Sequence, residues 1–150
     1  MSRATHEYLT DAELAAWHGC LEFTSAALRA LDEALMRAHR ISVKEFDVLI
    51  TLYNAPGKRL RMAQLADEVL LSPAGVSHMV TRLEKAGLVR RSVDDADRRS
   101  LFATLTPDGD RRLRDSRPTH NQVVRAHLTE RLSDAQLAAL GRLWRTVLPR

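Results

Sequence analysis

The sequence predicts a mainly α-helical fold that carries one small antiparallel β-wing. Through most of the chain, apolar residues recur three and four positions apart, which is the spacing of one helix face. Two runs, 88–93 and 100–105, are strand-like instead, and the second alternates with the period of a half-buried strand. Helix-capping Ser or Thr residues stand directly before the helical segments, at Thr10, Ser42, Ser72, Thr106 and Ser133.

The first helix is predicted to be long. Thr10-Asp-Ala-Glu13 forms a capping box, and a seam of large apolar residues follows it at alternating steps of three and four. We therefore expect a helix from about Asp11 to about Ala38. A small domain cannot cover such a helix by itself, so we expect it to pack against the C-terminal part of the chain and a second subunit.

A short second helix is predicted from Ser42-Val-Lys-Glu45, which is another capping box. Its inner face consists of Val43, Phe46, Leu49, Ile50 and Tyr53. The helix should end before Asn54-Ala-Pro-Gly57, because proline and glycine favour a turn there. The segment Lys58–Arg61 then reads as a short extended piece that could supply a third strand.

Two helices and a hairpin are predicted between Met62 and Leu105. The first helix has an apolar face of Met62, Leu65, Ala66 and Val69. Ser72 caps the second helix, Pro73 fits its first position, and Gly87 supplies a left-handed stop. The second helix places Val76, Met79, Val80 and Leu83 inward.

A charged tip, residues 94–99, joins the two strand-like runs that follow these helices. Helix, short turn, helix and charged hairpin is the layout of a winged helix-turn-helix, which inserts its second helix into the major groove of DNA. We therefore predict that this segment binds double-stranded DNA.

The C-terminal third is predicted to be helical. Thr106-Pro107 begins a helix that should reach about Leu132, with a kink or a break near Arg117 because Pro118 lies inside it. Ser133-Asp-Ala-Gln136 caps a last helix, whose apolar stripe consists of Leu137, Leu140, Leu143, Trp144, Val147 and Leu148. Packing the two chain ends together, and against a twin copy, would cover these stripes.

Charge and composition are compatible with DNA binding. The 150 residues carry a formal net charge of +4. Residues 1–40 hold four Arg against six acidic residues, whereas residues 58–99 hold nine basic residues against six acidic ones. The basic excess thus falls on the predicted DNA-binding segment, as attraction to phosphate requires. One cysteine excludes an internal disulfide, and there is no signal peptide or long apolar run, so we expect a cytoplasmic protein without a membrane partner.

The run LLSPAGVSHMVTRLEKAGLVRRSVDDADRRSLFATLTPDG closely resembles the MarR family of bacterial transcriptional regulators. The matching motifs are R-L-E-x-x-G-L-V-x-R, the D-x-x-D-R-R wing and the L-T-x-x-G entry into the next helix. A weaker similarity, I-S-x-x-E-F-D-V-L, covers Ile41 to Leu49. The resemblance implies a triangular homodimer that binds a short palindromic operator, usually as a repressor that a ligand or oxidation releases.

The resemblance also implies how the chain is organised. Residues 1–150 would form a single MarR-type domain. Within it, residues 42–105 would form the winged helix-turn-helix DNA-binding lobe. Residues 10–39 and 107–150 would form the helical dimerisation region.

The base-contacting residues are expected in the N-terminal half of the second helix. Ser77 and His78 are the candidates for base contacts, while the cap Ser72 and the small residues Ala74 and Gly75 would allow close approach. Thr81 and Arg82, one turn further on, are expected to touch phosphate. The family often carries arginine where His78 stands, and a histidine offers one neutral donor or acceptor at a time, which weakens a preference for guanine.

In the wing, the resemblance indicates Arg99, with Arg98 second, as the side chain that enters the flanking minor groove, where a guanidinium meets concentrated negative potential. Asp94 or Asp97 would pair with Arg98 and fix the shape of the loop. Further candidates for backbone phosphate contacts are Arg90, Arg91, Lys58 and Arg61.

The regulatory residues are less clearly marked. Cys20 has mostly apolar neighbours, which favours a buried structural thiol over a redox sensor. His120 and His127 are seven residues apart, unlike the i, i+4 pair that chelates zinc on a helix, so we predict no metal and no cofactor. A small aromatic or phenolic anion is a candidate effector, lodged between the dimerisation region and the DNA-binding lobe near Trp17, His18, His39, Arg61 and His120.

Two other classes of protein are alternatives to a DNA-binding regulator, namely an enzyme and a protein-binding module. An enzyme would need a nucleophile with a base, a metal cluster or a phosphate loop, and the sequence has no motif of these kinds, so we predict no catalytic residues. A winged-helix module that binds protein is the better rival. It would be expected to lose the basic wing and to expose apolar residues on its second helix, whereas this chain keeps Arg98 and Arg99.

Overall fold

The computed structural model describes residues 8–69, 71–93 and 100–148. In chain order its elements are α1 (Asp11–His39), α2 (Val43–Asn54), the 3-10 turn η1 (Pro56–Lys58), β1 (Arg59–Arg61), α3 (Met62–Glu68), α4 (Pro73–Lys85), β2 (Val89–Val93), β3 (Leu101–Leu105), α5 (Pro107–His127), the 3-10 turn η2 (Thr129–Arg131) and α6 (Asp134–Val147). The predicted fold class, mainly helical with a small antiparallel wing, is confirmed. None of the described helices is long and apolar enough to cross a membrane.

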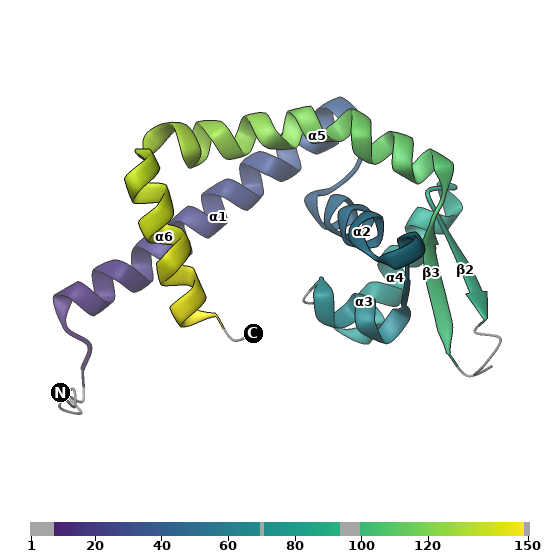
Figure 1. The fold of residues 1–150 in the computed structure, drawn as a ribbon, viewed down its shortest axis with the longest axis horizontal. Helices are drawn as coiled ribbons and strands as arrows, with labels where there is room; N and C mark the ends of the chain where they lie inside the picture. Colours follow the sequence, from purple (N-terminus) through teal and green to yellow (C-terminus); the bar gives the residue numbers. More distant parts are fainter. Residues whose placement is uncertain (1–7, 70, 94–99, 149–150) are drawn as a thin grey trace.

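The elements form two regions joined along α5 (Figure 1). One region, which we call the hairpin lobe, comprises residues 43–105 and lies under the N-terminal end of α5. The other, the helical arm, comprises residues 11–30 of α1 together with α6. In Figure 1, α1 extends away from the hairpin lobe and α6 descends from the far end of α5.

The sheet of the hairpin lobe has the strand order β1-β3-β2, and both pairings are antiparallel. Of the extended piece predicted at Lys58–Arg61, residues Arg59–Arg61 form the strand β1, whereas Lys58 belongs to η1. Ala103 of β3 stands opposite Leu60 of β1 and Arg91 of β2. Because side chains alternate across a sheet, these three share one face, the face that also buries Val89 and Leu105 in the core.

The apolar core lies in the hairpin lobe and its junction with α1 and α5. Among the residues that the structure describes, every buried hydrophobic side chain falls between Leu31 and Leu113. The largest fully buried ones are Phe46, Leu35, Leu49, Leu52, Leu65, Leu83 and Leu113. The inner faces predicted for the second, third and fourth helices supply eight of the 18 buried hydrophobic residues in the described part of the chain, whereas Val48 and Leu52 of α2 are fully buried without having been predicted.

Helix α5 corrects one prediction. It runs unbroken through Pro118 (Figure 1), whereas a break near Arg117 was one of the two outcomes expected there. Proline removes one backbone donor, and α5 packs along both α1 and α2, so tertiary contacts hold the helix across that loss. The helix ends at His127 rather than near Leu132, where the backbone of Leu128 leaves the helical region.

Gly109 fixes the start of α5 against the hairpin lobe. A Cβ at this position would lie 2.1 Å from the carbonyl oxygen of Leu88 and 2.7 Å from Leu105 Cδ1. The cap residue Thr106 accepts a hydrogen bond from the Gly109 amide at 3.0 Å and donates one to the Gly87 carbonyl at 2.7 Å. The glycine of the L-T-x-x-G motif thus allows a close approach between two backbone segments that a side chain would prevent.

Candidate nucleic-acid interface

Helix α4 is built to present its N-terminal half to solvent. The Ser72 hydroxyl accepts a hydrogen bond from the Gly75 amide at 3.1 Å, and Pro73 occupies the first turn, as predicted. Val76, Val80 and Leu83 are buried and fasten the opposite side of the helix to the core. The capped N-terminal end of α4 therefore lies at the surface, while the buried side chains on the opposite side hold the helix in place.

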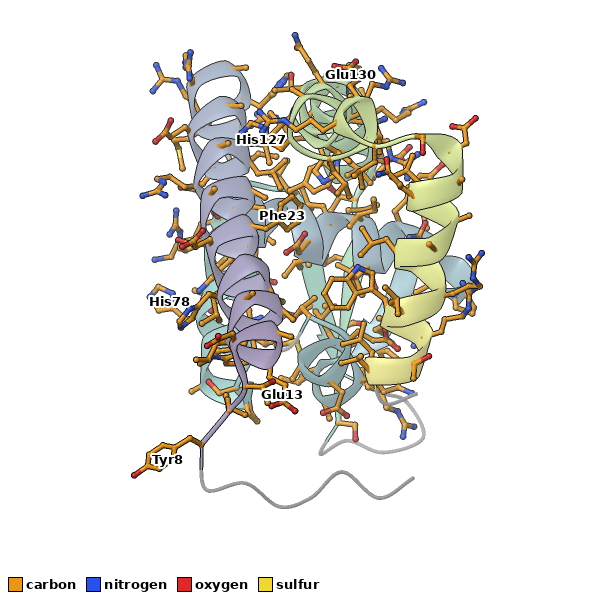
Figure 2. All side chains as sticks on the ribbon, turned by 90° about the vertical axis from the view of Figure 1, so that its left-hand side faces the viewer. Tyr8, Glu13, Phe23, His78, His127 and Glu130 are labelled. Carbon is orange, nitrogen blue, oxygen red and sulfur yellow. The ribbon has the colours of Figure 1, made fainter. Side chains whose placement is uncertain are left out.

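The residues predicted to contact bases lie on that open side. Ser72, Ala74, Ser77 and His78 are exposed, and Figure 2 shows His78 at the outer edge of the molecule. Gly75 is half-buried, and a Cβ there would stand 3.2 Å from the Ser72 hydroxyl oxygen. Gly75 therefore has a local role, since it leaves room for the cap, in addition to the close approach to DNA expected from the sequence.

Thr81 and Arg82 are both engaged in contacts within the protein. The Thr81 hydroxyl donates to the Ser77 carbonyl at 2.8 Å and accepts from the Arg91 guanidinium. Arg82 Nη2 lies 3.3 Å from Oε1 of the buried Glu45. Because Glu45 also closes the capping box of α2, Arg82 ties α4 to α2 and keeps about half of its side chain exposed for an anion.

Neighbouring arginines of β2 point to opposite faces of the sheet. Arg91 turns toward α4, whereas Arg90 is exposed on the outer face, in one cross-strand row with Thr104 and Arg59. The next row holds Arg61 and Phe102, and the Arg59 guanidinium lies 3.8 Å from the centre of the Phe102 ring. The outer face of the sheet is thus rich in arginine.

Lys58 was also a candidate for phosphate contact. Its Nζ lies 3.2 Å from Asp110 Oδ1 and 4.7 Å from the centre of the Tyr53 ring. These contacts connect η1 to the start of α5 and give Lys58 a structural role.

The wing tip lies outside the described residues. This holds for Arg98 and Arg99, the predicted minor-groove side chains, and for Asp94 and Asp97, the predicted loop-stabilising acids. Their roles remain predictions from the sequence.

The five residues proposed for an effector do not form one site. Trp17 and His18 are exposed in the first half of α1, and Arg61 lies over the Phe102 ring at 5.7 Å. His39 and His120 lie instead at the junction of α1, α2 and α5. His39 Nε2 is 2.8 Å from the Thr119 hydroxyl, and the His120 ring stacks on Phe46 with a centroid distance of 4.5 Å.

One carboxyl at this junction has a shifted pKa. Burial raises the pKa of Asp47 above its ordinary value of 3.8, and the nearby His120 lowers it by a smaller amount. In the part of the chain that the structure describes, His, Cys, Asp and Glu side chains form no group of three that could hold a metal ion.

The helical arm contains a large apolar groove that the sequence did not delimit. Figure 2 looks into it, with α1 on one side, α6 on the other, and Phe23 between them. Its volume is about 1200 Å³, and Trp17 and Trp144 line it from opposite helices. Cys20 also lines the groove and is half-buried. In a single chain its thiol is therefore not fully buried, whereas the sequence predicts a buried thiol.

Comparison with known proteins gives consistent matches. The model of the MarR family matches residues 41–101. The transcriptional regulator MhqR of Bacillus subtilis is 31% identical over 99 residues, which is 64% of this chain and 67% of MhqR. The regulator PecS of Dickeya dadantii is 32% identical over 82 residues, which is 54% of this chain and 49% of PecS.

Among solved structures, a MarR family regulator from Streptomyces coelicolor, Sco3205, was crystallised in complex with DNA. It superposes with a TM-score of 0.90 at 34% identity, covering 97% of this chain and 91% of that protein. The matched region includes both the hairpin lobe and the helical arm. The similarity therefore extends over the whole architecture.

Proposed function

Because the chain belongs to the MarR family of transcriptional regulators, we propose that it binds a palindromic operator as a homodimer and represses transcription until a small molecule releases it. It is a DNA-binding regulator, in keeping with its family and relatives. Operator, dimer, sign of regulation and ligand are the proposed details.

The observation that carries the proposal is the open side of α4. Small and polar side chains, Ala74, Ser77 and His78, are exposed there on a helix whose other side is buried in the core. A helix of this kind fits the major groove, and its N-terminal residues then face the base edges. A protein-binding module would favour apolar residues on the same side.

The homodimer is supported by the apolar groove of the helical arm. Trp17, Leu143 and Val147 are 55%, 61% and 69% exposed, although a single domain rarely leaves so many large apolar side chains together in water. A second copy seated on this groove would cover them. A palindrome presents its half-sites one helical turn apart, roughly 34–36 Å, so operator binding requires the two α4 helices of this dimer to lie at that spacing.

The proposed effector is a small aromatic or phenolic anion. Of the predicted residues, His39 and His120 lie where α1, α2 and α5 meet, between the two regions of the molecule. A ligand bound at this junction would act on the link between the helical arm and the hairpin lobe.

Selection of bound fragments from a genomic library tests the proposal, followed by fluorescence-anisotropy titrations of the tightest fragment at several salt concentrations. Arg99→Ala should weaken binding and lower the salt slope by about one unit, because one phosphate-neutralising charge is lost. Arg125→Ala, an exposed arginine on α5, is the matched control and should leave the slope unchanged. Absence of salt-sensitive binding by the native protein would overturn the proposal.

A further inference from the structure

Arg91 connects the wing to α4 through three separate groups. Its backbone amide donates to Glu84 Oε1 at 3.0 Å, and its Nη2 donates to the Ser77 carbonyl at 3.1 Å. The same Nη2 also donates to the Thr81 hydroxyl, and Nε lies 3.5 Å from Glu84 Oε2. Only 24% of the side chain is exposed, so the guanidinium fills the space between β2 and α4.

The contacts of Arg91 depend on its planar guanidinium, which lysine lacks. A guanidinium presents several donors in a rigid plane. Here Nη2 makes both side-chain hydrogen bonds, to a carbonyl and a hydroxyl, while the buried Nε makes none and faces the Glu84 carboxylate at ion-pair distance. The three partners lie on successive turns of one side of α4, at Ser77, Thr81 and Glu84. Arg91 is therefore fixed against the length of the helix rather than at one point.

One attachment point coincides with a residue proposed to read bases. Ser77 accepts the Arg91 hydrogen bond through its carbonyl, while its side chain is exposed beside His78. The Thr81 hydroxyl bonds to the same carbonyl at 2.8 Å, so Thr81 also belongs to the connection. Hence a change in the position of the wing strand acts directly on the backbone of the base-reading turn.

From these contacts we propose that Arg91 is a positioning residue, which sets the wing relative to Ser77 and His78 so that both reach the same duplex in register. The proposal rests on the proposed function. Arg91 acts through Ser77, Thr81 and Glu84, and it contacts no phosphate. Thr81, which the sequence assigned to phosphate, is in this account a second member of the connection.

The test measures the ratio of affinities for the selected genomic fragment and for a scrambled duplex of equal length. Arg91→Met keeps the stem and removes the donors, and it should lower this ratio by about tenfold, the size of one lost base contact. The salt slope should stay unchanged, because counterion release follows phosphate contacts. Arg91→Lys keeps the charge and should still lower the ratio several-fold, since one ammonium cannot replace the planar fork.

Arg125→Ala is the matched control, because Arg125 is an exposed arginine of α5 that lies outside the hairpin lobe. It should leave both the ratio of affinities and the salt slope unchanged. Thr81→Val, which removes the hydroxyl that accepts from Arg91 and donates to the Ser77 carbonyl without changing charge, should lower the ratio about threefold. In the Thr81→Val background, Arg91→Met should cost less than it does alone, because the two side chains share one contact.

Thermal melts establish whether each variant folds. If Arg91→Met does not fold, Thr81→Val provides the test in its place. A native protein that discriminates poorly between the two duplexes would overturn the proposed function. If the native protein discriminates and Arg91→Met discriminates equally well, the positioning role is wrong. A lower salt slope with an unchanged ratio would identify Arg91 as a phosphate contact, which also overturns it.

Discussion

The hairpin lobe and the helical arm differ in how completely one chain buries their apolar residues. In the hairpin lobe, Phe46, Leu65 and Val80 are almost fully buried, and among its described residues the exposed large apolar side chains are Val93 and Leu101. In the arm, Trp17 and Leu143 remain more than half exposed on helices with comparable apolar stripes. The comparison shows that amphipathic helices of one chain can bury their apolar faces within the chain in one region and leave them exposed in another.

The largest expected effect comes from breaking the hairpin lobe at Gly109. Gly109→Ala should lower the free energy of unfolding by about 3 kcal/mol or more, because its Cβ would overlap the carbonyl oxygen of Leu88, which is backbone and cannot move aside. Urea denaturation at fixed protein concentration measures this. Gly87→Ala, where φ is +73° but the Cβ meets no atom within 4 Å, is the control and should cost about 1 kcal/mol. Equal costs at the two positions would contradict the close approach.

The arm should respond to a buried charge by separating subunits rather than by unfolding. Leu143→Asp places a carboxylate in the apolar groove, and we expect a monomer in sedimentation velocity together with a loss of operator affinity of about 100-fold or more. Ala138→Asp introduces the same charge at an exposed position of α6 that does not line the groove. That control should keep the native mass. A Leu143→Asp protein with the native mass would contradict the proposed dimer surface.

The smallest effect concerns the junction between the two regions, where burial raises the pKa of Asp47. A raised folded-state pKa means that the folded protein holds the proton more tightly, so stability falls as pH rises from the ordinary value of 3.8 through the raised one. Asp47→Asn should remove this part of the pH dependence. Because Asp47 is also partly exposed to solvent, which screens its charge, the gain in stability at neutral pH should be no more than about 0.5 kcal/mol. Urea midpoints of both proteins between pH 4 and 7 provide the measurement. Parallel curves would show that Asp47 contributes no pH dependence.

Much of the fold was predictable because its signals are local. Caps at Thr10, Ser42 and Ser72 gave the starts of three helices, and all three accept the expected amide hydrogen bonds. The end of α1 at His39 is one residue from the prediction. Of the two outcomes predicted at Pro118, a kink or a break, the break does not occur, because packing against α1 and α2 outweighs the cost of a missing donor.

The site was less predictable because its contacts depend on tertiary structure. The adjacent residues Arg90 and Arg91 look alike in sequence, and the strand alternation alone does not say which of them faces α4. The bond between His39 and Thr119 spans 80 residues. Glu45 looked like an ordinary cap residue, and its ion pair with Arg82 could not be seen without the packing of α2 on α4.

The unbroken course of α5 has a mechanical consequence for a dimer joined through the arm. Its first turn packs against Leu88, its last turn borders the arm, and the helix is continuous between them. One extra base pair at the centre of an operator rotates the two halves by roughly 35°. A continuous helix of this kind cannot absorb that rotation. The protein would therefore discriminate operators by the spacing of their half-sites as strictly as by their base sequence.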